Sequence, residues 1–262
     1  MPKLTVENQF LDLSDYGRPI AIQIAKSLQN TKVTAIHLTG CFLISGTAAI
    51  FCILQNQFIL AGIFLILKCI LDAADGELAR AKNHPSYVGR YLDSIFDFIL
   101  NAGILWAIFY VSNNTKTALF VAFIAMELQG SLYNYYYIIK RSKLSGSDKT
   151  SRIEETSSPI AFKGEDQKMV NRMYFIFNLM YAPFDKTIIY CDKTAQLRNS
   201  FPNWFMSLTS IYGLGFQLLI ISFMLAFRIN ELIIPFFIAY SAAGVVMIGI
   251  RKTWLPYSSA DF

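Results

Sequence analysis

The segment that decides the fold is DAADGELARAKNHPSYVGRYLDSIFD, which occupies residues 72–97. It joins two apolar segments and yet contains four aspartates. An ionisable side chain at the centre of a membrane span costs about 2.5–3.5 kcal/mol on insertion scales, so a charge retained there is a candidate functional group. The segment therefore predicts a chemically active site between two helices.

The aspartates and glycines of this segment repeat with the period of an α-helix. Positions 72, 75, 76 and 79 share one helix face, and positions 89, 93 and 97 share a face of the next helix. Because the two helices run in opposite directions, Asp72 and Asp97 are expected at the same depth, about 12 Å from the connection at 1.5 Å per residue. We therefore expect the two faces to enclose one cavity.

A cluster of four carboxylates favours a bound divalent cation. Crowded carboxylates repel one another and take up protons unless cations neutralise them, and oxygen ligands suit Mg²⁺ or Mn²⁺. The chain has only two histidines, and its four cysteines follow no paired spacing, so neither a zinc site nor a disulfide framework is indicated. Gly76 and Gly89 leave room for a bulky ligand; close packing of helices is the alternative explanation.

The composition indicates an all-α polytopic membrane protein. Of 262 residues, 54% are hydrophobic and 16% are charged, and the mean hydropathy is +0.41. Soluble domains usually contain roughly 25% charged residues, so an ordinary soluble enzyme is not indicated and no nucleic-acid partner is expected. We predict six transmembrane helices, each near the ~20 residues that a span requires, at residues 33–54, 58–79, 88–111, 117–139, 204–227 and 232–250.

The basic residues predict the side of the membrane on which each connection lies. Of the 23 Lys and Arg, only Lys116 and Arg228 lie in the three short connections between spans, and Lys68 lies within a span. All others are on the opposite side, and the more basic side is usually cytoplasmic. We therefore expect both termini and the active site in the cytoplasm, and the membrane to be the plasma or inner membrane if the cell is bacterial.

The predicted spans divide the chain into three parts. Residues 1–32 form a cytoplasmic N-terminal segment without a cleavable signal peptide. Residues 33–250 form the six-helix membrane domain, which includes a long cytoplasmic connection at 140–203 between the fourth and fifth spans. Residues 251–262 form a cytoplasmic tail.

Two segments outside the spans have helical patterns of their own. In the N-terminal segment, Ile20, Ile24 and Leu28 give one apolar face, and we predict an interfacial amphipathic helix that contacts membrane lipids. Within 140–203, methionines and a phenylalanine recur at helical intervals over 169–189. One or two surface helices are expected there, and a solvated charged loop is the alternative.

The motif in residues 72–97 has the form D-x-x-D-G-x-x-A-R, eight residues, G-x-x-x-D-x-x-x-D. It resembles the complete signature of the CDP-alcohol phosphotransferase (CDP-alcohol phosphatidyltransferase) family, with every fixed position filled and every gap of family length. The resemblance implies a six-helix membrane enzyme of phospholipid biosynthesis, usually a homodimer. Such an enzyme transfers a substituted phosphoryl group from a CDP-linked alcohol to an acceptor hydroxyl and releases CMP.

The resemblance also implies roles for individual residues. The implied ligands of the Mg²⁺ or Mn²⁺ ions are Asp72, Asp75, Asp93 and Asp97. The implied CDP-binding residues are Gly76, Ala79, Arg80 and Gly89. Asp97 is in addition the implied catalytic base.

These residue types suit the chemistry. Two metals ~3.5–4 Å apart can stabilise the attacking and the leaving oxygen of a phosphoryl transfer while carboxylates hold them. An acceptor hydroxyl is a weak nucleophile at neutral pH, so a carboxylate that accepts its proton adds ~10²–10⁴ in rate, and Asp97 is placed for that role. Arg80 either contacts phosphate or pairs with Glu77 or a metal-ligand aspartate.

The sequence does not identify the alcohol that accepts the phosphoryl group. The candidate acceptor or cavity residues are Lys68, Arg90, Glu127 and Arg141. Lys68 either binds an acceptor phosphate or forms an ion pair with Glu127 or Asp72. Glycerol 3-phosphate, inositol 1-phosphate, serine and amino alcohols are all candidate acceptors, and the form with Glu77 resembles family members that act on inositol-phosphate-type substrates.

The expected donor is CDP-diacylglycerol, because the cavity must open to lipid if the product is to stay in the bilayer. The alternative is a CDP-linked soluble head group donated to a lipid or inositol-phosphate acceptor. Two other classes of protein also keep carboxylates in the membrane. Intramembrane prenyltransferases place Asp pairs on distant helices and release pyrophosphate, and an ion transporter has no need of the Gly and Arg positions of this motif.

Overall fold

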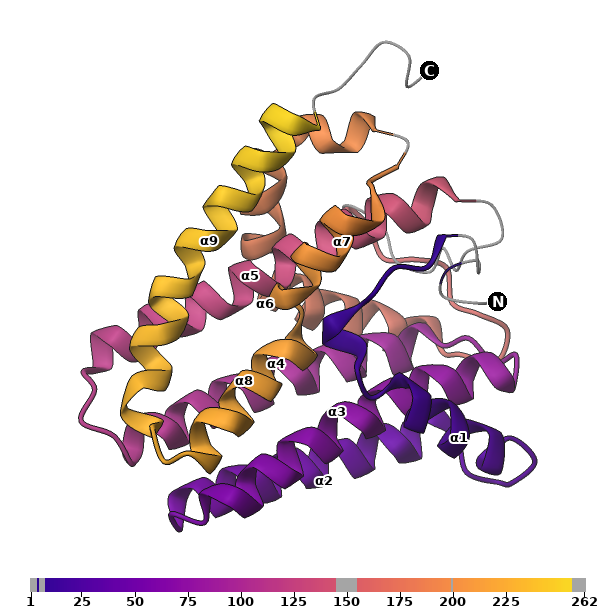
Figure 1. The fold of residues 1–262 in the computed structure, drawn as a ribbon. Coiled ribbons are helices and arrows are strands. Elements are labelled where there is room, and N and C mark those ends of the chain that lie inside the picture. Colours follow the sequence, from indigo (N-terminus) through magenta and orange to yellow (C-terminus); the bar gives the residue numbers. More distant parts are fainter. Residues whose placement is uncertain (1–3, 5–7, 145–154, 199, 256–262) are drawn as a thin grey trace.

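The computed structural model describes residues 4, 8–144, 155–198 and 200–255, and these form helices and short 3-10 turns without a strand (Figure 1). The α-helices are α1 (Arg18–Leu28), α2 (Ala35–Leu54), α3 (Phe58–Ala81), α4 (Tyr87–Tyr110), α5 (Lys116–Lys143), α6 (Gln167–Cys191), α7 (Asn203–Thr209), α8 (Leu214–Ala226) and α9 (Ile233–Trp254). The 3-10 turns are η2 (Leu13–Asp15), η3 (Lys193–Leu197), η4 (Ser210–Tyr212) and η5 (Asn230–Leu232). The all-α prediction is confirmed for these residues. Most of the predicted tail, from residue 256 onward, lies outside them.

The helices pack around an apolar core, which is the largest of several clusters of buried side chains. The adjacent helices α2 and α3 lie side by side, α8 runs along α3, and α9 packs against α5 (Figure 1). The core contains one buried side chain or more from each of α2, α3, α4, α8 and α9, among them Phe42, Leu65, Ile104, Leu218 and Phe237. Helices that would individually be marginal are thus stabilised by burying their apolar faces against one another.

Every predicted span coincides with helical structure, but only some helices meet the criteria for a membrane span. Three are long and apolar enough, namely α2, α4 and the stretch Asn230–Trp254. A fourth is present if α7 to η4 and α8, which meet at 52°, form one broken span. Polar side chains such as Asp72 in α3 and Glu127 in α5 reduce the apolar character of the other two. A membrane protein is therefore supported, and the count of six spans stays a prediction.

Two of the connections predicted to lie on the same side of the membrane meet at one end of the molecule. The backbone N–H of Asn113 donates to Glu231 at 2.8 Å, and the Asn230 side chain donates to the carbonyl of Val111 at 3.2 Å. The turn between α2 and α3 lies at this end too (Figure 1). The alternation of chain direction predicted from the sequence is thus present.

Helix α1 packs along α3. The residues that it buries are not those of the apolar face formed by Ile20, Ile24 and Leu28. Its buried residues are Ala21 and Ala25, and Ile20 remains 50% exposed. The small alanines allow the two helix backbones to approach closely, so Ile24 and Leu28 only flank the contact. The exposure of Ile20 is compatible with the predicted contact between α1 and membrane lipids, which stays a prediction.

The long connection at 140–203 contains one extended helix, α6. It packs against α4 and α5, and its Val170 is buried beside Tyr91 and Ile95 of α4. The prediction of a helix in this connection is confirmed, and the alternative of a solvated loop is wrong for these residues. Because α6 contacts two other helices, it also forms part of the wall of the cavity described next.

Candidate active site

The aspartate segment encloses a cavity of about 950 Å³. It lies between α3 and α4, with further walls from α1, α5 and α6. Of the residues predicted from the sequence, those that line it are Asp72, Asp75, Gly76, Ala79, Arg80, Gly89, Arg90, Asp93, Asp97, Glu127 and Arg141. The structure thus brings together in one cavity all but one of the predicted site residues, the exception being Lys68.

Three carboxylates converge on one point of this cavity. Asp72, Asp75 and Asp93 each present an oxygen, and these three oxygens lie within 4.8 Å of one another. Asp75 is 7% exposed, and its Oδ2 accepts a hydrogen bond of 2.6 Å from the Thr39 hydroxyl of α2. Oδ1 of Asp93 is buried and has no hydrogen-bond partner within the described part of the chain. A buried carboxylate oxygen without a donor is costly unless a cation or proton neutralises it.

This donor set fits a hard divalent cation. All three groups are carboxylates, and oxygen ligands select Mg²⁺ or Mn²⁺ over zinc or copper. The unpartnered oxygen of Asp93 gives such a cation an available ligand. The geometry is therefore compatible with a metal held by Asp72, Asp75 and Asp93.

Asp97 has a different partner from these three aspartates. The ammonium of Lys68 forms an ion pair with it and contacts Asp72 at 3.3 Å. Lys68 is fully buried below the cavity and lies 4.9 Å from the centre of the Phe42 ring. Of the two ion-pair partners predicted for Lys68, Asp72 is confirmed and Glu127 is wrong. Lys68 does not line the cavity, because the two carboxylates hold its side chain behind them.

The two glycines of the motif face open space rather than another helix. A Cβ at Gly89 would meet only Ser86, at 3.2 Å from its Oγ, and a Cβ at Gly76 would first meet the Arg80 guanidinium at 3.4 Å. Both neighbours belong to the same helix or its cap. Close packing against another helix therefore does not explain these glycines, and the space beside them is available to a ligand.

A series of paired charged side chains extends from Arg80, beside Gly76, to the N-terminal segment. Glu77 forms an ion pair with Arg80 at 2.8 Å and accepts a hydrogen bond from Arg18 at 2.5 Å. The first of these is one of the alternatives predicted for Arg80. Arg18, which also pairs with Asp15, was not predicted from the sequence because it lies outside the motif and reaches the cavity only through the packing of α1 on α3.

The remaining predicted residues lie along the cavity wall. Arg90 pairs with Glu155, and its guanidinium lies 4.9 Å from the centre of the Tyr91 ring. Glu127 is 6% exposed and accepts a hydrogen bond of 3.4 Å from Asn101. Arg141 lies 5.7 Å from the centre of the Tyr137 ring.

Helix α6 adds residues that the motif did not indicate. Asp185 lines the cavity and accepts a hydrogen bond of 2.7 Å from the Ser131 hydroxyl. Burial raises the pKa of Asp185 to about 6, although the hydrogen bond from Ser131 opposes this shift. Tyr181, also in the wall, donates to the carbonyl of Ser94 at 2.8 Å. An aspartate within the helical pattern of 169–189 was the signal available in the sequence.

Comparison with known proteins identifies the family. Residues 32–184, more than half of the chain, match the family model described as CDP-alcohol phosphatidyltransferase. The chain belongs to this family. The enzymes of this family are transferases of phosphate-containing groups, so membership does not support the alternatives of a prenyltransferase and an ion transporter.

Two named relatives and one unnamed one resemble the chain. It is 45% identical over 87 residues to the archaetidylinositol phosphate synthase of Pyrococcus horikoshii, and the match covers 33% of this chain and 46% of that protein. It is 43% identical over 67 residues to the bifunctional IPC transferase and DIPP synthase of Thermococcus kodakarensis, over 26% of this chain and 16% of that protein. An uncharacterized protein of Aquifex aeolicus is 34% identical over 99 residues, 37% of this chain and 50% of that protein. The matches therefore span about half or less of each relative.

Enzymes of the CDP-alcohol phosphatidyltransferase family use divalent metals, which agrees with the three converging carboxylates. The matched region contains α2 to α5 and most of α6, and so includes the whole of the aspartate segment. The cavity and the family assignment thus point to the same part of the chain.

Proposed function

We propose that the cavity between α3 and α4 transfers a phosphatidyl, or another substituted phosphoryl, group from a CDP-alcohol to an acceptor hydroxyl and releases CMP. The observation that supports this most directly is the convergence of Asp72, Asp75 and Asp93 within 4.8 Å at a cavity that Asp97 also lines. CDP-diacylglycerol is the proposed donor. A CDP-linked soluble head group is the alternative.

In this proposal the four aspartates have different roles. Asp72, Asp75 and Asp93 hold the divalent metal, with Asp97 as a further ligand if two ions bind. Bound Mg²⁺ or Mn²⁺ would neutralise the charge that develops on the attacking and leaving oxygens. Asp97 accepts the proton of the acceptor hydroxyl, and Lys68 positions its carboxylate.

The nucleotide part of the donor is proposed to bind along the open face of the motif. Gly76, Ala79 and Gly89 leave space beside the backbone, and Arg80 supplies a fixed positive charge for phosphate. Arg80 lies beside Glu77, which also pairs with Arg18. Binding of a phosphate would therefore compete with Glu77 for the Arg80 guanidinium.

We propose an inositol phosphate as the first acceptor to test. One relative is an archaetidylinositol phosphate synthase, and Arg90 and Arg141 line the cavity where a second phosphate group would need positive charge. Glycerol 3-phosphate, serine and amino alcohols are the competing acceptors. Glu127 and Asp185 add carboxylates to the same cavity, and carboxylates accept hydrogen bonds from the hydroxyls of a polyol.

The proposed setting is a multi-pass membrane enzyme with six spans, in which both termini and the cavity face the cytoplasm. The basic residues of the sequence support this orientation. A homodimer is proposed only because enzymes of this family are usually homodimers.

An acceptor screen tests the proposal. The purified protein is incubated with CDP-diacylglycerol and Mn²⁺ or Mg²⁺, and CMP is measured against inositol 1-phosphate, glycerol 3-phosphate, serine and an amino alcohol. Metal-dependent CMP release with at least one acceptor is expected. Absence of CMP release with every acceptor would refute CDP-diacylglycerol as the donor, and absence with CDP-linked soluble head groups as well would refute the proposed reaction. Release with an acceptor other than inositol phosphate would refute only the proposed acceptor.

A further inference from the structure

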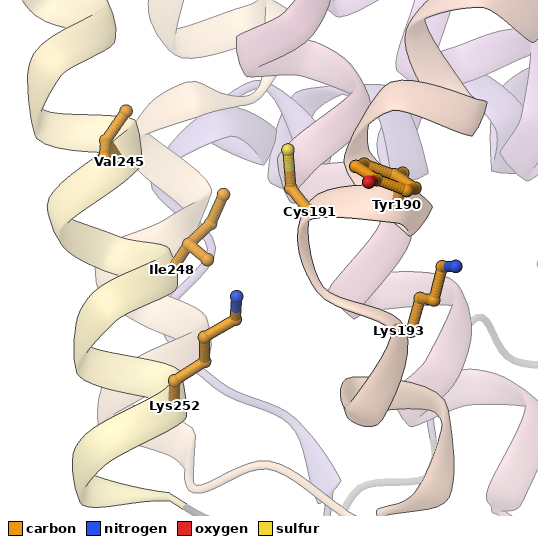
Figure 2. A pocket seen from close by; sticks show the side chains of 6 residues that line it. All are labelled: Tyr190, Cys191, Lys193, Val245, Ile248 and Lys252. Atoms are coloured by element: carbon orange, nitrogen blue, oxygen red, sulfur yellow. The ribbon is translucent and has the colours of Figure 1, made fainter.

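We propose that a groove between α9 and the end of α6 binds an anionic phospholipid, with the lipid phosphate beside Lys252 and Lys193. The groove has a volume of about 600 Å³. It is lined by Tyr190, Cys191, Lys193, Val245, Ile248 and Lys252 (Figure 2). None of these residues lines the cavity of the aspartates.

The α9 wall changes from apolar to cationic along one stripe. Val245, Ile248 and Lys252 are at positions i, i+3 and i+7 and so share one helix face. Figure 2 shows them one above another on the side of α9 that faces the groove. Lys252 follows Ile248 by about 6 Å along the helix at 1.5 Å per residue. An acyl chain beside the apolar residues would therefore place its phosphate near the ammonium.

The depth of Lys252 in the bilayer also suits a lipid head group. The stretch Asn230–Trp254 is one of the candidate membrane spans, and Lys252 lies in its last turn. Trp254, two residues further, is 74% exposed, and exposed tryptophan at the end of a span is typical of the membrane interface. The lysine is thus expected at the level of the lipid phosphates, with Val245 in the hydrocarbon region.

The opposite wall supplies a second cation, Lys193, whose side chain leads away from α9 in Figure 2 and so adds positive charge at the edge of the groove. Lys193 is exposed, and its Nζ lies 4.8 Å from the centre of the Tyr190 ring, which is itself 76% exposed. Among the described residues, no carboxylate oxygen lies within ion-pair distance of either Lys193 or Lys252. Arg251, the neighbour of Lys252, is in contrast buried and paired with Asp192. The two ammonium groups therefore provide positive charge that the described protein does not neutralise.

The two walls are fixed relative to each other. Nε of Arg251 in α9 donates to Asp192 at 2.6 Å, and Nη2 of the same guanidinium donates to the Thr194 hydroxyl at 2.7 Å. Asp192, which follows α6 directly, also accepts a hydrogen bond of 2.8 Å from Tyr136. Because this network is buried under the groove, the groove is formed before a ligand arrives, which lowers the entropic cost of binding.

The reactivity of Cys191 gives a direct measurement, because its thiol lies in the groove and is exposed. In detergent solution, the rate of maleimide modification is measured at Cys191 and at Cys41 by peptide mass spectrometry, with added dioleoylphosphatidylglycerol or dioleoylphosphatidylcholine. Cys41 is also exposed and lies away from the groove on the candidate span α2, so it reports how far any added lipid covers the apolar surface. The anionic lipid is expected to slow modification of Cys191 more than the zwitterionic lipid does, whereas the two lipids are expected to affect Cys41 equally.

The variant Lys193→Gln/Lys252→Gln is expected to need roughly tenfold more phosphatidylglycerol for the same protection, because each basic residue near a lipid surface strengthens such binding severalfold. The matched control is Lys26→Gln/Lys168→Gln, which removes two exposed lysines elsewhere and is expected to leave protection unchanged. No substrate is added, so the outcome is separate from that of the proposed transfer reaction.

Three results would overturn the proposal. Equal protection by both lipids would show an apolar groove without head-group recognition. Protection by inorganic phosphate alone would show a site for a soluble anion. Protection that depends on protein concentration and is lost when the protein is monomeric would show that a second copy of the chain covers the groove.

Discussion

Lys68 gives the four aspartates two different environments. Its fully buried ammonium pairs with Asp97 and contacts Asp72, whereas Oδ1 of Asp93 has no donor among the described residues. A buried lysine is tolerated only when its charge is paired, so Lys68 fixes where Asp97 lies. One end of the cluster is thus neutralised by the protein, and the other end is left for a cation.

This division predicts different responses to Asn substitution. Asp97→Asn should lower turnover on the order of 10² or more at saturating metal and donor, because an amide cannot accept a proton. An Asn side chain keeps one oxygen that can still bind a metal. Excess Mn²⁺ should therefore restore part of the activity of at least one of the variants Asp72→Asn, Asp75→Asn and Asp93→Asn. The measurement is CMP release as a function of metal concentration for each variant.

Donor binding is the control for these variants. Asp97→Asn should still bind the CDP-alcohol, as seen by titration in the presence of metal. Turnover of Asp97→Asn close to that of the wild type would place the base elsewhere, and the phosphate of the acceptor would then be the better candidate.

At the scale of elements, the beginning of α4 depends on one carboxylate from a distant loop. Glu165 accepts hydrogen bonds from the Ser86 hydroxyl at 2.7 Å and from the backbone N–H groups of Tyr87 and Val88 at 3.1 and 3.0 Å. The ring of Phe162 stacks on Tyr87 at 4.5 Å between centroids. These contacts fix the first turn of the helix that presents Gly89 and Asp93.

The cap predicts a pH-dependent stability. Although burial opposes it, the hydrogen bonds to its carboxylate lower the pKa of Glu165 below its ordinary value. A carboxylate with a lowered pKa in the folded state stabilises the fold above its unfolded pKa, and this stabilisation is lost as the pH falls through the folded pKa. Glu165→Gln should therefore lower the melting temperature by about 2–4 °C at pH 7 and by less at pH 4.

Lys163→Gln, in the same loop, is the control for this comparison. Its difference from the wild type should stay constant over the same pH range, as measured by thermal unfolding in detergent. A Glu165→Gln difference that is equally large at pH 4 and pH 7 would show that the charge of Glu165 does not contribute.

At the scale of the whole molecule, the N-terminal segment connects parts of the chain that are far apart in sequence. The N–H of Leu13 donates to Ser210 at 2.9 Å, and Tyr133 donates to Asp12 at 2.5 Å. Ser14 lies so close to the start of α8 that a Cβ at Gly215 would overlap its carbonyl oxygen. The segment is thus part of the packed structure and supplies Arg18 to the cavity.

This close approach predicts that Gly215→Ala destabilises the protein. Overpacking usually costs about 1–3 kcal/mol, and a backbone oxygen cannot move aside as a flexible side chain can. Gly249→Ala is the matched control, since no atom lies within 4 Å of a Cβ there and alanine favours the helix. The melting temperature of Gly215→Ala should fall by several degrees while that of Gly249→Ala is unchanged or higher; equal values would contradict the observed packing.

The proposed orientation is tested by thiol labelling of intact cells. In a chain whose native cysteines are replaced, Asn113→Cys should react with a membrane-impermeant maleimide, because its connection is expected outside. Lys163→Cys should react only after the membrane is opened. Labelling of Lys163→Cys in intact cells would reverse the orientation and place the cavity away from cytoplasmic CDP substrates.

Helical periodicity was sufficient to predict the centre of the site. The spacing of Asp72, Asp75 and Asp93 defines helix faces, and two antiparallel neighbours bring such faces together. Periodicity contains no information on which distant segments cover the cavity, so Arg18, Asp185 and Glu165 were not predicted. The partner of Lys68 was only partly predicted, since its ion pair with Asp97 joins α3 to α4 and periodicity within one helix does not show which side chains meet between two helices.

The contact between Leu13 and Ser210 joins residues 197 positions apart. During synthesis Leu13 therefore leaves the ribosome long before Ser210 exists, and this contact must wait until the helices between them are made. Such long-range contacts form late in folding. The part of the cavity wall where Ser14 meets the start of α8 is thus completed only near the end of translation, and a growing chain does not hold a finished site.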